Sequence, residues 1–515
     1  MDFKNVQSTL LNRFNSVLVC ILFSSFIVSC VSKKTIPAND ILGHAPKQVR
    51  NIFKGFRFVD STHFVTGSNS YMKPTENDST LLVCNYLRIG TVSSPIYILD
   101  HEVTNAEYKE FINWVTDSIA LSLIANKNSS YYLDRDKKIL DWKKRSTIWT
   151  DSNRTFLDSL YYHGNVRYYS GRQQLDTRKL IYKYFDGRDT IIIPVYPDTT
   201  IWVTEFRYAY NDPFTRVYFS HPAYHNYPVI GVSWQQANAY CHWKTERLKE
   251  NWAKNKIKNI PKKIKYRLPT EIEWEYSAYG YNLQSLKENI DNKRIYPWVG
   301  FSLLDKNGKY LANFGNIKDQ NMIGIKYYGE DGGDYTTQVK LYPSNPNKIY
   351  DMAGNVAEWT SDIPERRSLI INSYFIYRGR VFKDEKAMIE QNRYYDSLDS
   401  VINKAIDSFR ITAADSLPSA IEKIVALDNY IGERGIDIPY GLTWWGSNDR
   451  KWIEQFAANE LHDAKVLAAH PNLRIIKGGS WATGPAYMLC SSREVFPENK
   501  CSSRIGFRLV LDIGK

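Results

Sequence analysis

The residues with the clearest chemical potential lie near the C-terminus, in the stretch KGGSWATGPAYMLCSSREVF from Lys477 to Phe496. The thiolate of Cys490 would be a nucleophile and a ligand for soft metals, and the Met488 thioether is a known type of copper(I) ligand. Cys501 follows eleven residues later, which makes it the most local disulfide partner for Cys490. The stretch therefore predicts either a reactive thiol site or a structural cysteine.

Two other patterns are typical of functional sites but lack the neighbours that such sites need. His221 and His225 in SHPAYH would share one face of a helix, as in a zinc site, but Pro222 predicts a loop and no HExxH pattern surrounds them. We expect loop histidines that make structural hydrogen bonds. Asp351 and Glu358 are seven residues apart in YDMAGNVAEW and could act as paired carboxylates, but nothing nearby completes a hydrolytic site.

The first 29 residues predict a lipoprotein signal peptide. Lys4 and Arg13 precede an apolar run, residues 17–28, that is too short to span a bilayer, and IVSC places Cys30 as in a bacterial lipobox. We expect lipidation of Cys30, because several acyl chains on one residue give stable anchoring. Val31 and Ser32 follow Cys30, and the absence of an acidic residue at these two positions favours the periplasmic face of the outer membrane, with residues 30–50 as a polar tether.

Composition limits the class of protein. With 515 residues, of which 43% are hydrophobic and 14% aromatic, the chain is able to bury a large core. The net charge of +12 would suit nucleic acid, but basic and acidic residues are interleaved and a secreted lipoprotein does not meet nucleic acid. An anionic partner or surface is the better use of this charge. Cys84, Cys241, Cys490 and Cys501 remain after processing, and spacing alone does not decide their pairing.

Three capping boxes in the sequence predict where three helices begin. Each has a hydroxyl residue followed three positions later by Glu or Gln, and the pairs are Thr104 with Glu107, Ser233 with Gln236, and Thr270 with Glu273. Aromatic segments punctuated by Gly and Pro surround them, and FRFVDSTHFVTGS, YPVIGVSW, IYPWVGF and SRIGFRLV predict short strands and loops.

The organisation predicted is one α+β domain over residues 51–515 with much irregular structure and no βαβ alternation. Two segments differ in composition from the rest and are predicted to be insertions. Residues 126–200 are rich in Tyr, Asp and Arg, with a weak strand signal at residues 190–195, and residues 382–469 have helical periodicity.

Seven motifs, in this order, resemble the formylglycine-generating-enzyme or sulfatase-modifying-factor domain. They are DHEVTNAEYKEF, YPVIGVSWQQANAYCHW, YRLPTEIEWEYSAYG, YPWVG, LANFGN, YDMAGNVAEWTSD and KGGSW with SRIGFRLV, and they frame residues 53–512. The resemblance implies a C-type-lectin-like α+β fold. It also implies an active site with two copper-binding cysteines, three and eight residues after the serine of GGS. Those positions are Thr483 and Met488 here, so the resemblance predicts a chain that is not an enzyme and has no catalytic residues.

The same resemblance implies two calcium sites, built from the oxygen ligands that calcium prefers, although no cofactor is required. One set is the side chains of Asn313 and Asp331 with the carbonyls of Phe314 and Gly333. The other is the side chains of Asp351 and Glu358 with the carbonyls of Gly354 and Val356.

A narrower resemblance lies in WVTEFRYAYNDPFTRVYFSHPAYHNYPVIGVSW and LDHEVTNAEYKEFINWVTDSIA, which look like the GldK/PorK lipoproteins of type IX secretion and gliding motility. It implies a structural subunit of a homo-oligomeric periplasmic ring, with a GldN/PorN-type partner and other machinery subunits, anchored under the outer membrane. The alternatives are a periplasmic oxidase of the formylglycine-generating type and a surface- or glycan-binding lipoprotein.

Overall fold

The computed structural model describes residues 53–67, 81–82, 88–163, 173–205, 217–256, 263–280, 294–315, 332–364, 408–432, 450–469 and 472–513. The chain divides into Met1–Lys54 and Gly55–Lys515, and the described residues from Gly55 onwards belong to the second unit. The predicted signal peptide, the tether, Cys30 and Cys84 lie outside the described residues. Within the described ranges, no helix combines the length and apolarity needed to cross a bilayer.

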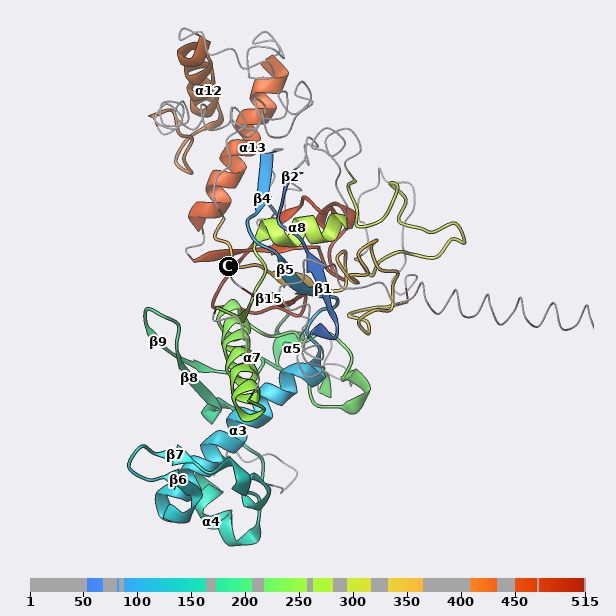
Figure 1. Ribbon diagram of the computed structural model, residues 1–515. Coiled ribbons are helices and arrows are strands. Elements are labelled where there is room, and N and C mark those ends of the chain that lie inside the picture. The colour runs from blue at the N-terminus through green and yellow to red at the C-terminus, as the bar shows by residue number, and fades with distance from the viewer. Residues whose placement is uncertain are drawn as a thin grey trace, which may run out of the picture. The chain divides into compact units, whose positions relative to one another are not determined.

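Two sheets form the centre of this unit. An antiparallel sheet has the order β1 (Phe56–Val59), β5 (Ile96–Leu99), β15 (Val510–Asp512) and β10 (Lys265–Arg267). A second sheet has the order β14 (Ile505–Gly506), β11 (Ala357–Trp359), β12 (Leu473–Lys477), β13 (Arg493–Pro497) and β3 (Leu81–Leu82). Only the β11–β14 pair of this sheet is parallel. Because β15 lies between β5 and β10, the last strand of the chain completes the central sheet (Figure 1).

Three separate strand pairs, seven α-helices and several 3-10 turns make up the rest of the described elements. The pairs are β2 (Thr62–Thr66) with β4 (Arg88–Val92), β6 (Tyr132–Asp134) with β7 (Ile139–Leu140), and β8 (Ile181–Phe185) with β9 (Thr190–Pro194). The α-helices are α3 (Asn105–Lys127), α4 (Arg154–Leu157), α5 (Ile201–Glu205), α7 (Trp234–Lys254), α8 (Glu271–Tyr279), α12 (Leu417–Gly432) and α13 (Arg450–Ala469). The 3-10 helices are η2 (Ser129–Tyr131), η3 (Trp142–Thr147), η4 (Asp151–Asn153), η5 (Asp158–Leu160), η7 (Thr177–Lys179), η8 (Pro222–Tyr224) and η9 (Pro485–Met488). The mixture of helices and mainly antiparallel sheets is α+β, as predicted.

All three predicted capping boxes are confirmed. Thr104 precedes α3, Ser233 precedes α7 and Thr270 precedes α8, and in each case both reciprocal hydrogen bonds form. Each box satisfies amide groups that a helix start leaves without partners, so these helices begin where local chemistry requires. The α8 helix ends at Gly280, whose φ of 62° is a left-handed conformation that favours glycine.

The four aromatic segments predicted to form short strands and loops contain both. FRFV and SRIGFRLV contain strands, but YPVIGVSW has only an isolated bridge from Pro228 to Thr104. This segment crosses between elements, because the Val229 amide donates to the Val103 carbonyl and the Gly231 amide to the Ser502 carbonyl. IYPWVGF contains no strand either, and the Ile295 carbonyl accepts from the Cys490 amide.

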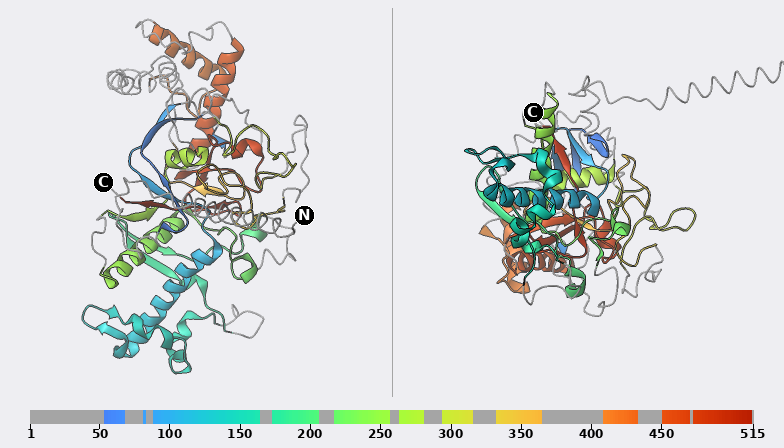
Figure 2. Two further views of the ribbon diagram at one scale, coloured as in Figure 1. Left: turned by 45° about the vertical axis from the view of Figure 1, so that its right-hand side comes forward. Right: turned by 90° about the horizontal axis from the view of Figure 1, so that it is seen from below.

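The α3 and α7 helices pack side by side through aromatic rings (Figures 1 and 2). Phe111 of α3 contacts Tyr240 and Trp243 of α7 with ring centroids 5.9 and 5.2 Å apart, and Tyr108 stacks on Tyr240 at 5.4 Å. Since each buried aromatic ring removes a large apolar area from water, this contact fixes α3 against the core.

The C-terminal half of α3 extends into the first predicted insertion, which has its own small core. Leu121 and Ile124 of α3 pack there with Ile148, Leu157 and Leu160. Figure 2 shows the same relation, with the segments after α3 gathered around its far end. Of the second predicted insertion, the structure describes α12 and α13, and α13 confirms the helical periodicity predicted there.

Candidate functional site at the loop after β12

The loop that follows β12 brings together the two positions to which the resemblance assigns copper-binding cysteines. Gly478 and Gly479 have φ of 96° and 66°, values that residues with a side chain rarely adopt. A Cβ at Gly479 would lie 3.1 Å from both the Met488 amide nitrogen and the Thr483 hydroxyl oxygen. The chain therefore folds back closely at Gly479, so that Thr483 and Met488 both adjoin it.

Thr483 uses its hydroxyl to hold this turn. The oxygen accepts from the Ser480 amide at 2.7 Å, and the Thr483 amide donates to the Ser480 carbonyl at 3.0 Å. The residue is buried. A hydroxyl engaged in this way satisfies the backbone of the turn, and it does not supply the soft thiolate that copper(I) prefers.

Met488 is an apolar packing residue. It is fully buried in a cluster with Tyr296, Ala312, Phe314 and Ala353. A thioether fills irregular space well and can bind copper(I), but a single thioether is a weaker donor set than two thiolates. The second copper position is therefore filled by the core of the protein.

Cys490 and Cys501 do not form the predicted disulfide. Cys490 is fully buried in one apolar cluster with Trp274 and Met352, whereas Cys501 packs in another cluster beside Trp202. Burial raises the pKa of Cys501 to about 12, so that thiol stays protonated at neutral pH. Cys241 is similar, because burial raises its pKa to about 12. None of these described cysteines is arranged as an activated nucleophile.

His221 and His225 lie in a loop, as expected. The His221 ring accepts from the Ala223 amide at 3.1 Å and caps the short helix η8. The His225 backbone amide donates to the Pro222 carbonyl at 3.1 Å. Across the described ranges, no group of three or more His, Cys, Asp and Glu side chains is arranged to hold a metal ion.

The described part of the first predicted calcium set fits a bound cation. The Asn313 side-chain oxygen is buried and makes no hydrogen bond to a described residue, although its amide nitrogen donates to the Tyr335 carbonyl at 2.7 Å. A Cβ at Gly333 would lie 3.3 Å from that nitrogen, so Gly333 adjoins Asn313. A buried carbonyl oxygen without a donor is costly unless something else binds it. Asp331 lies outside the described residues.

The second predicted calcium set is engaged by the protein itself. Both Glu358 oxygens accept from the Arg508 guanidinium at 2.5 Å, and Oε2 also accepts from Trp274 Nε1 at 2.7 Å. Asp351 Oδ2 accepts from the Lys340 amide at 2.7 Å. Gly354 and Val356 belong to the same turn, where their amides donate to the Gly478 carbonyl and to Glu102. Arg508 and Trp274 already occupy both Glu358 oxygens, so the Glu358 side chain in this arrangement does not fit a calcium ion.

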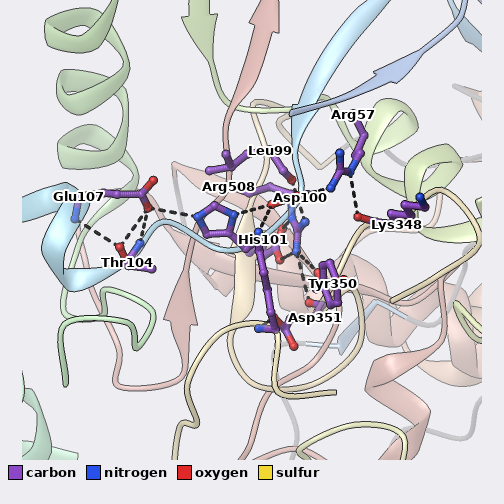
Figure 3. Close-up of polar contacts among 12 residues, drawn as sticks. Arg57, Leu99, Asp100, His101, Thr104, Glu107, Lys348, Tyr350, Asp351 and Arg508 are labelled. Atoms are coloured by element: carbon purple, nitrogen blue, oxygen red, sulfur yellow. Dashed lines mark hydrogen bonds and ion pairs between the residues drawn. The ribbon is translucent and has the colours of Figure 1, made fainter. Parts of the chain in front are cut away.

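Arg508 is the centre of a buried charge cluster that sequence reasoning missed. It is fully buried and also donates to the carbonyls of Leu99, Tyr350 and Asp351 (Figure 3). Three carboxylates, those of Glu102, Asp351 and Glu358, surround this one guanidinium. The isolated arginine in the buried run GFRLV was the available signal, because a buried charge needs a partner.

The excess of carboxylates changes their protonation. Burial, together with the neighbouring carboxylates, raises the pKa of Glu102 well above its usual range. Burial raises the pKa of Asp351 to about 6, and Glu358 contributes to the rise.

A second network lies beside this cluster (Figure 3). There the His101 ring contacts Asp100 at 2.7 Å and Glu107 at 3.5 Å. Burial favours the neutral imidazole of His101, but these two carboxylates outweigh it and raise the His101 pKa.

The substitution Asp351→Asn is expected to change how stability depends on pH. Because the pKa of Asp351 is higher in the folded state than the ordinary value of 3.8, folding binds its proton, and stability falls as pH rises from about 4 to about 6. Asparagine does not titrate and tolerates the φ of 55° at this position. The variant should gain on the order of 2 kcal/mol relative to the wild type between pH 4 and pH 7, measured by urea unfolding. Asp305→Asn is the matched control, because backbone hydrogen bonds lower the pKa of Asp305 and give the opposite sign. Parallel pH profiles for wild type and Asp351→Asn would contradict the assignment.

Comparison with known proteins agrees with the motifs. The model of the sulfatase-modifying factor enzyme 1-like domain matches residues 57–406. The chain belongs to this family. The match includes Asn313, Asp351 and Glu358 and ends before the KGGSW loop, which the structure joins to it through the β11–β12 pair.

Curated relatives carry the name of the enzyme. Mouse formylglycine-generating enzyme is 36% identical over 137 residues, which is 27% of each chain. The enzyme of that name from Thermomonospora curvata is 32% identical over 137 residues, 27% of this chain and 34% of the relative. A bovine protein named inactive C-alpha-formylglycine-generating enzyme 2 is 32% identical over 136 residues, 26% of this chain and 33% of the relative. The chain thus aligns with about a quarter to a third of the length of these relatives.

Solved structures give weaker likenesses. PvdO from Pseudomonas aeruginosa has a TM-score of 0.35 at 14% identity, covering 88% of this chain and 93% of that one. Treponema denticola variable protein 1 has a TM-score of 0.35 at 15% identity, covering 88% and 94%. Neither decides the function.

The prediction of a structural ring subunit of the type IX secretion machinery is wrong on these findings. The family match and the relatives are those of formylglycine-generating enzymes, which favour the alternative of an oxidase-type protein. The narrower resemblance to GldK/PorK lipoproteins has no support among them. The GldN/PorN-type partner and the ring depended on that resemblance alone and stay untested predictions.

Proposed function

We propose that this protein is a ligand-binding member of the sulfatase-modifying-factor family that does not carry out copper-dependent oxidation. One observation carries the proposal: the two positions expected to hold copper are a turn-forming hydroxyl at Thr483 and a core thioether at Met488. Neither can become a thiolate, and two thiolates are what a copper(I) site of this kind requires. The bovine relative whose name calls it inactive also supports a protein of this family without oxidase activity. The lectin-like fold implied by the resemblance would be the binding scaffold.

A copper(I) competition titration tests this proposal. The purified wild-type protein is titrated against a chromogenic copper(I) chelator, beside Met488→Leu, which keeps the apolar packing and removes the sulfur. The two proteins should be indistinguishable, with no stoichiometric copper bound. One copper per chain in the wild type, lost in Met488→Leu or in Cys490→Ala, would overturn the proposal.

A second candidate function is an oxidase of the formylglycine-generating type, which the names of the relatives favour. Cys490 would be its thiol, two residues beyond the second copper position. Its complete burial argues against this role, because a catalytic thiol has to meet copper and substrate. Conversion of cysteine to formylglycine in a sulfatase-type peptide that is lost in Cys490→Ala would establish the oxidase.

Anchoring at Cys30 belongs to the same proposal. The signal sequence and the lipobox support anchoring of the protein at the periplasmic face of the outer membrane. Cells that express the wild type are labelled with a fatty-acid analogue, and the label should co-migrate with the protein in the membrane fraction. Cys30→Ser should lose the label and leave the membrane, whereas Cys20→Ser should keep both. Labelling that persists in Cys30→Ser would contradict the anchor.

Calcium at the first set is the remaining part of the proposal. The orphaned Asn313 oxygen supports it, and Asp331 and the carbonyls of Phe314 and Gly333 would complete the ligands. The ion would join loops and stabilise the fold. Removal of calcium with a chelator is expected to lower Tm by several degrees, because an ion that binds only the folded state stabilises it. Asn313→Ala should be insensitive to chelation, and a wild-type Tm that does not change would count against the site.

A further inference from the structure

A large cavity lies between α3 and the first insertion, away from the loop after β12. Its volume is about 1190 Å³, and its lining comes from α3, from parts of the segments around Trp149 and Leu175, and from Tyr196, Phe219 and Ser220. We call it the α3 pocket. The α3 helix contributes a stripe at helical spacing, namely Lys109, Ile112, Asn113, Thr116 and Asp117. This volume is above the usual range for drug-sized ligands, which leaves room for a short oligomer.

The pocket carries an excess of positive charge. Lys109, Lys143 and Arg145 line it, against the single carboxylate of Asp117. Arg145 Nε donates to Asp117 Oδ2 at 2.5 Å, but the terminal guanidinium nitrogens make no hydrogen bond to the described residues. The Arg145 side chain is 57% exposed whereas that of Asp117 is 9% exposed. Asp117 thus holds the Arg145 guanidinium in place, while the two terminal nitrogens remain available. These nitrogens can bind a ligand carboxylate in the bidentate geometry typical of arginine.

Asp117 also orients an aromatic ring in the pocket. Its second oxygen accepts from Trp149 Nε1 at 3.0 Å, and Trp149 is 45% exposed. One buried carboxylate therefore fixes a cation and an indole in adjacent positions. A rigid, half-exposed aromatic ring gives a large contact area to a flat ligand face at a low entropic cost.

The remaining lining residues favour a saccharide over a peptide. The carboxamides of Asn113 and Gln174 are both donors and acceptors, which suits hydroxyl groups, and Tyr161 adds a further ring. Pairing with a strand edge is one common way to bind an extended peptide, and the lining offers only the isolated bridge between Tyr161 and Leu175 and none of the strands given above.

We propose that the α3 pocket binds an acidic oligosaccharide, in which Arg145 pairs with a sugar carboxylate and Trp149 packs against a neighbouring sugar ring. The proposal names a ligand class for the binding role proposed above and rests on that role. It uses residues of the first insertion, so the pocket is separate from the positions of Thr483 and Met488.

Calorimetry on the full-length protein in detergent tests this proposal, with oligogalacturonate as the acidic saccharide. Maltohexaose is the neutral control and oligoglutamate the peptide control. Of the three ligands, only oligogalacturonate is expected to bind, and added salt should weaken its binding. Arg145→Gln should weaken it about tenfold or more, because one charge-assisted contact is lost. Trp149→Ala should weaken it several-fold, and Trp149→Phe should restore most of the affinity.

Arg178→Gln is the matched control for Arg145→Gln. Arg178 is also an exposed arginine of the first insertion paired with a buried aspartate, Asp176, and it does not line the pocket. It should bind oligogalacturonate like the wild type. Absence of oligogalacturonate binding, equal binding of maltohexaose, or Arg145-dependent binding of oligoglutamate would each overturn the proposal. The copper titration is independent of these results, so the binding site can fail while the loss of copper chemistry stands.

Discussion

Replacement of Arg508 by methionine is expected to lower the free energy of unfolding by about 3–5 kcal/mol. The guanidinium is fully buried and neutralises Glu358, while it also satisfies the carbonyls of Leu99 and Tyr350. Methionine has a similar length and no charge. The variant therefore leaves Glu358 and its neighbour Glu102 in the core without a cation, and the cost of a buried uncompensated charge is large.

Urea unfolding of Arg508→Met and of Arg178→Met makes this comparison. Arg178 forms a similar pair with Asp176, but its side chain is 69% exposed, so its loss should cost far less stability than the loss of Arg508. The double variant Arg508→Met with Glu358→Gln should recover part of the loss, because the orphaned charge is removed. An Arg508→Met cost no greater than that of Arg178→Met would contradict the central position of this arginine.

Two cysteines placed at Thr483 and Met488 are expected to create a copper(I) site with one ion per chain. Both positions adjoin Gly479 in the folded loop, and the resemblance assigns to them the thiolates of the active family. Soft thiolates bind copper(I) far more tightly than a hydroxyl and a thioether do. The double variant should therefore pass from no measurable binding to stoichiometric binding in the chelator titration.

Thr483→Ser with Met488→Leu is the matched control for the cysteine pair. Serine keeps the hydroxyl that accepts from the Ser480 amide, and leucine keeps the apolar packing in the cluster around Phe314. This control should bind no copper and unfold close to the wild-type urea midpoint. If the double cysteine variant bound no more copper than this control, positions 483 and 488 would not be the ones that the active family uses.

Features that depend on local chemistry could be predicted from the sequence. The boxes at Thr104, Ser233 and Thr270 formed as expected because a cap needs only residues three positions apart. Which of the aromatic segments become strands could not be predicted: YPVIGVSW forms a loop, in which Val229 and Gly231 donate to carbonyls far away in the chain, at Val103 and Ser502. Composition and alternation do not specify such partners.

The candidate site shows the same difference between features that depend on local sequence and features that depend on distant residues. The residue types at Thr483 and Met488 could be read directly, and their meaning came from the resemblance. Arg508 and Glu358 are 150 residues apart, and nothing local to Glu358 indicates that an arginine rather than calcium neutralises it. The separate clusters of Cys490 and Cys501 were hidden in the same way, because eleven residues of spacing allow a disulfide but do not bring the sulfurs together.

The most direct test of the central claim is whether the wild-type protein oxidises a cysteine. The full-length protein is incubated with a sulfatase-type CxPxR peptide, copper and oxygen, and the peptide is followed by mass spectrometry. With a hydroxyl at Thr483 and a buried thioether at Met488, the peptide should keep its cysteine, while a formylglycine-generating enzyme converts it in parallel. Formation of formylglycine by the wild type, with turnover that Cys490→Ala abolishes, would contradict the account.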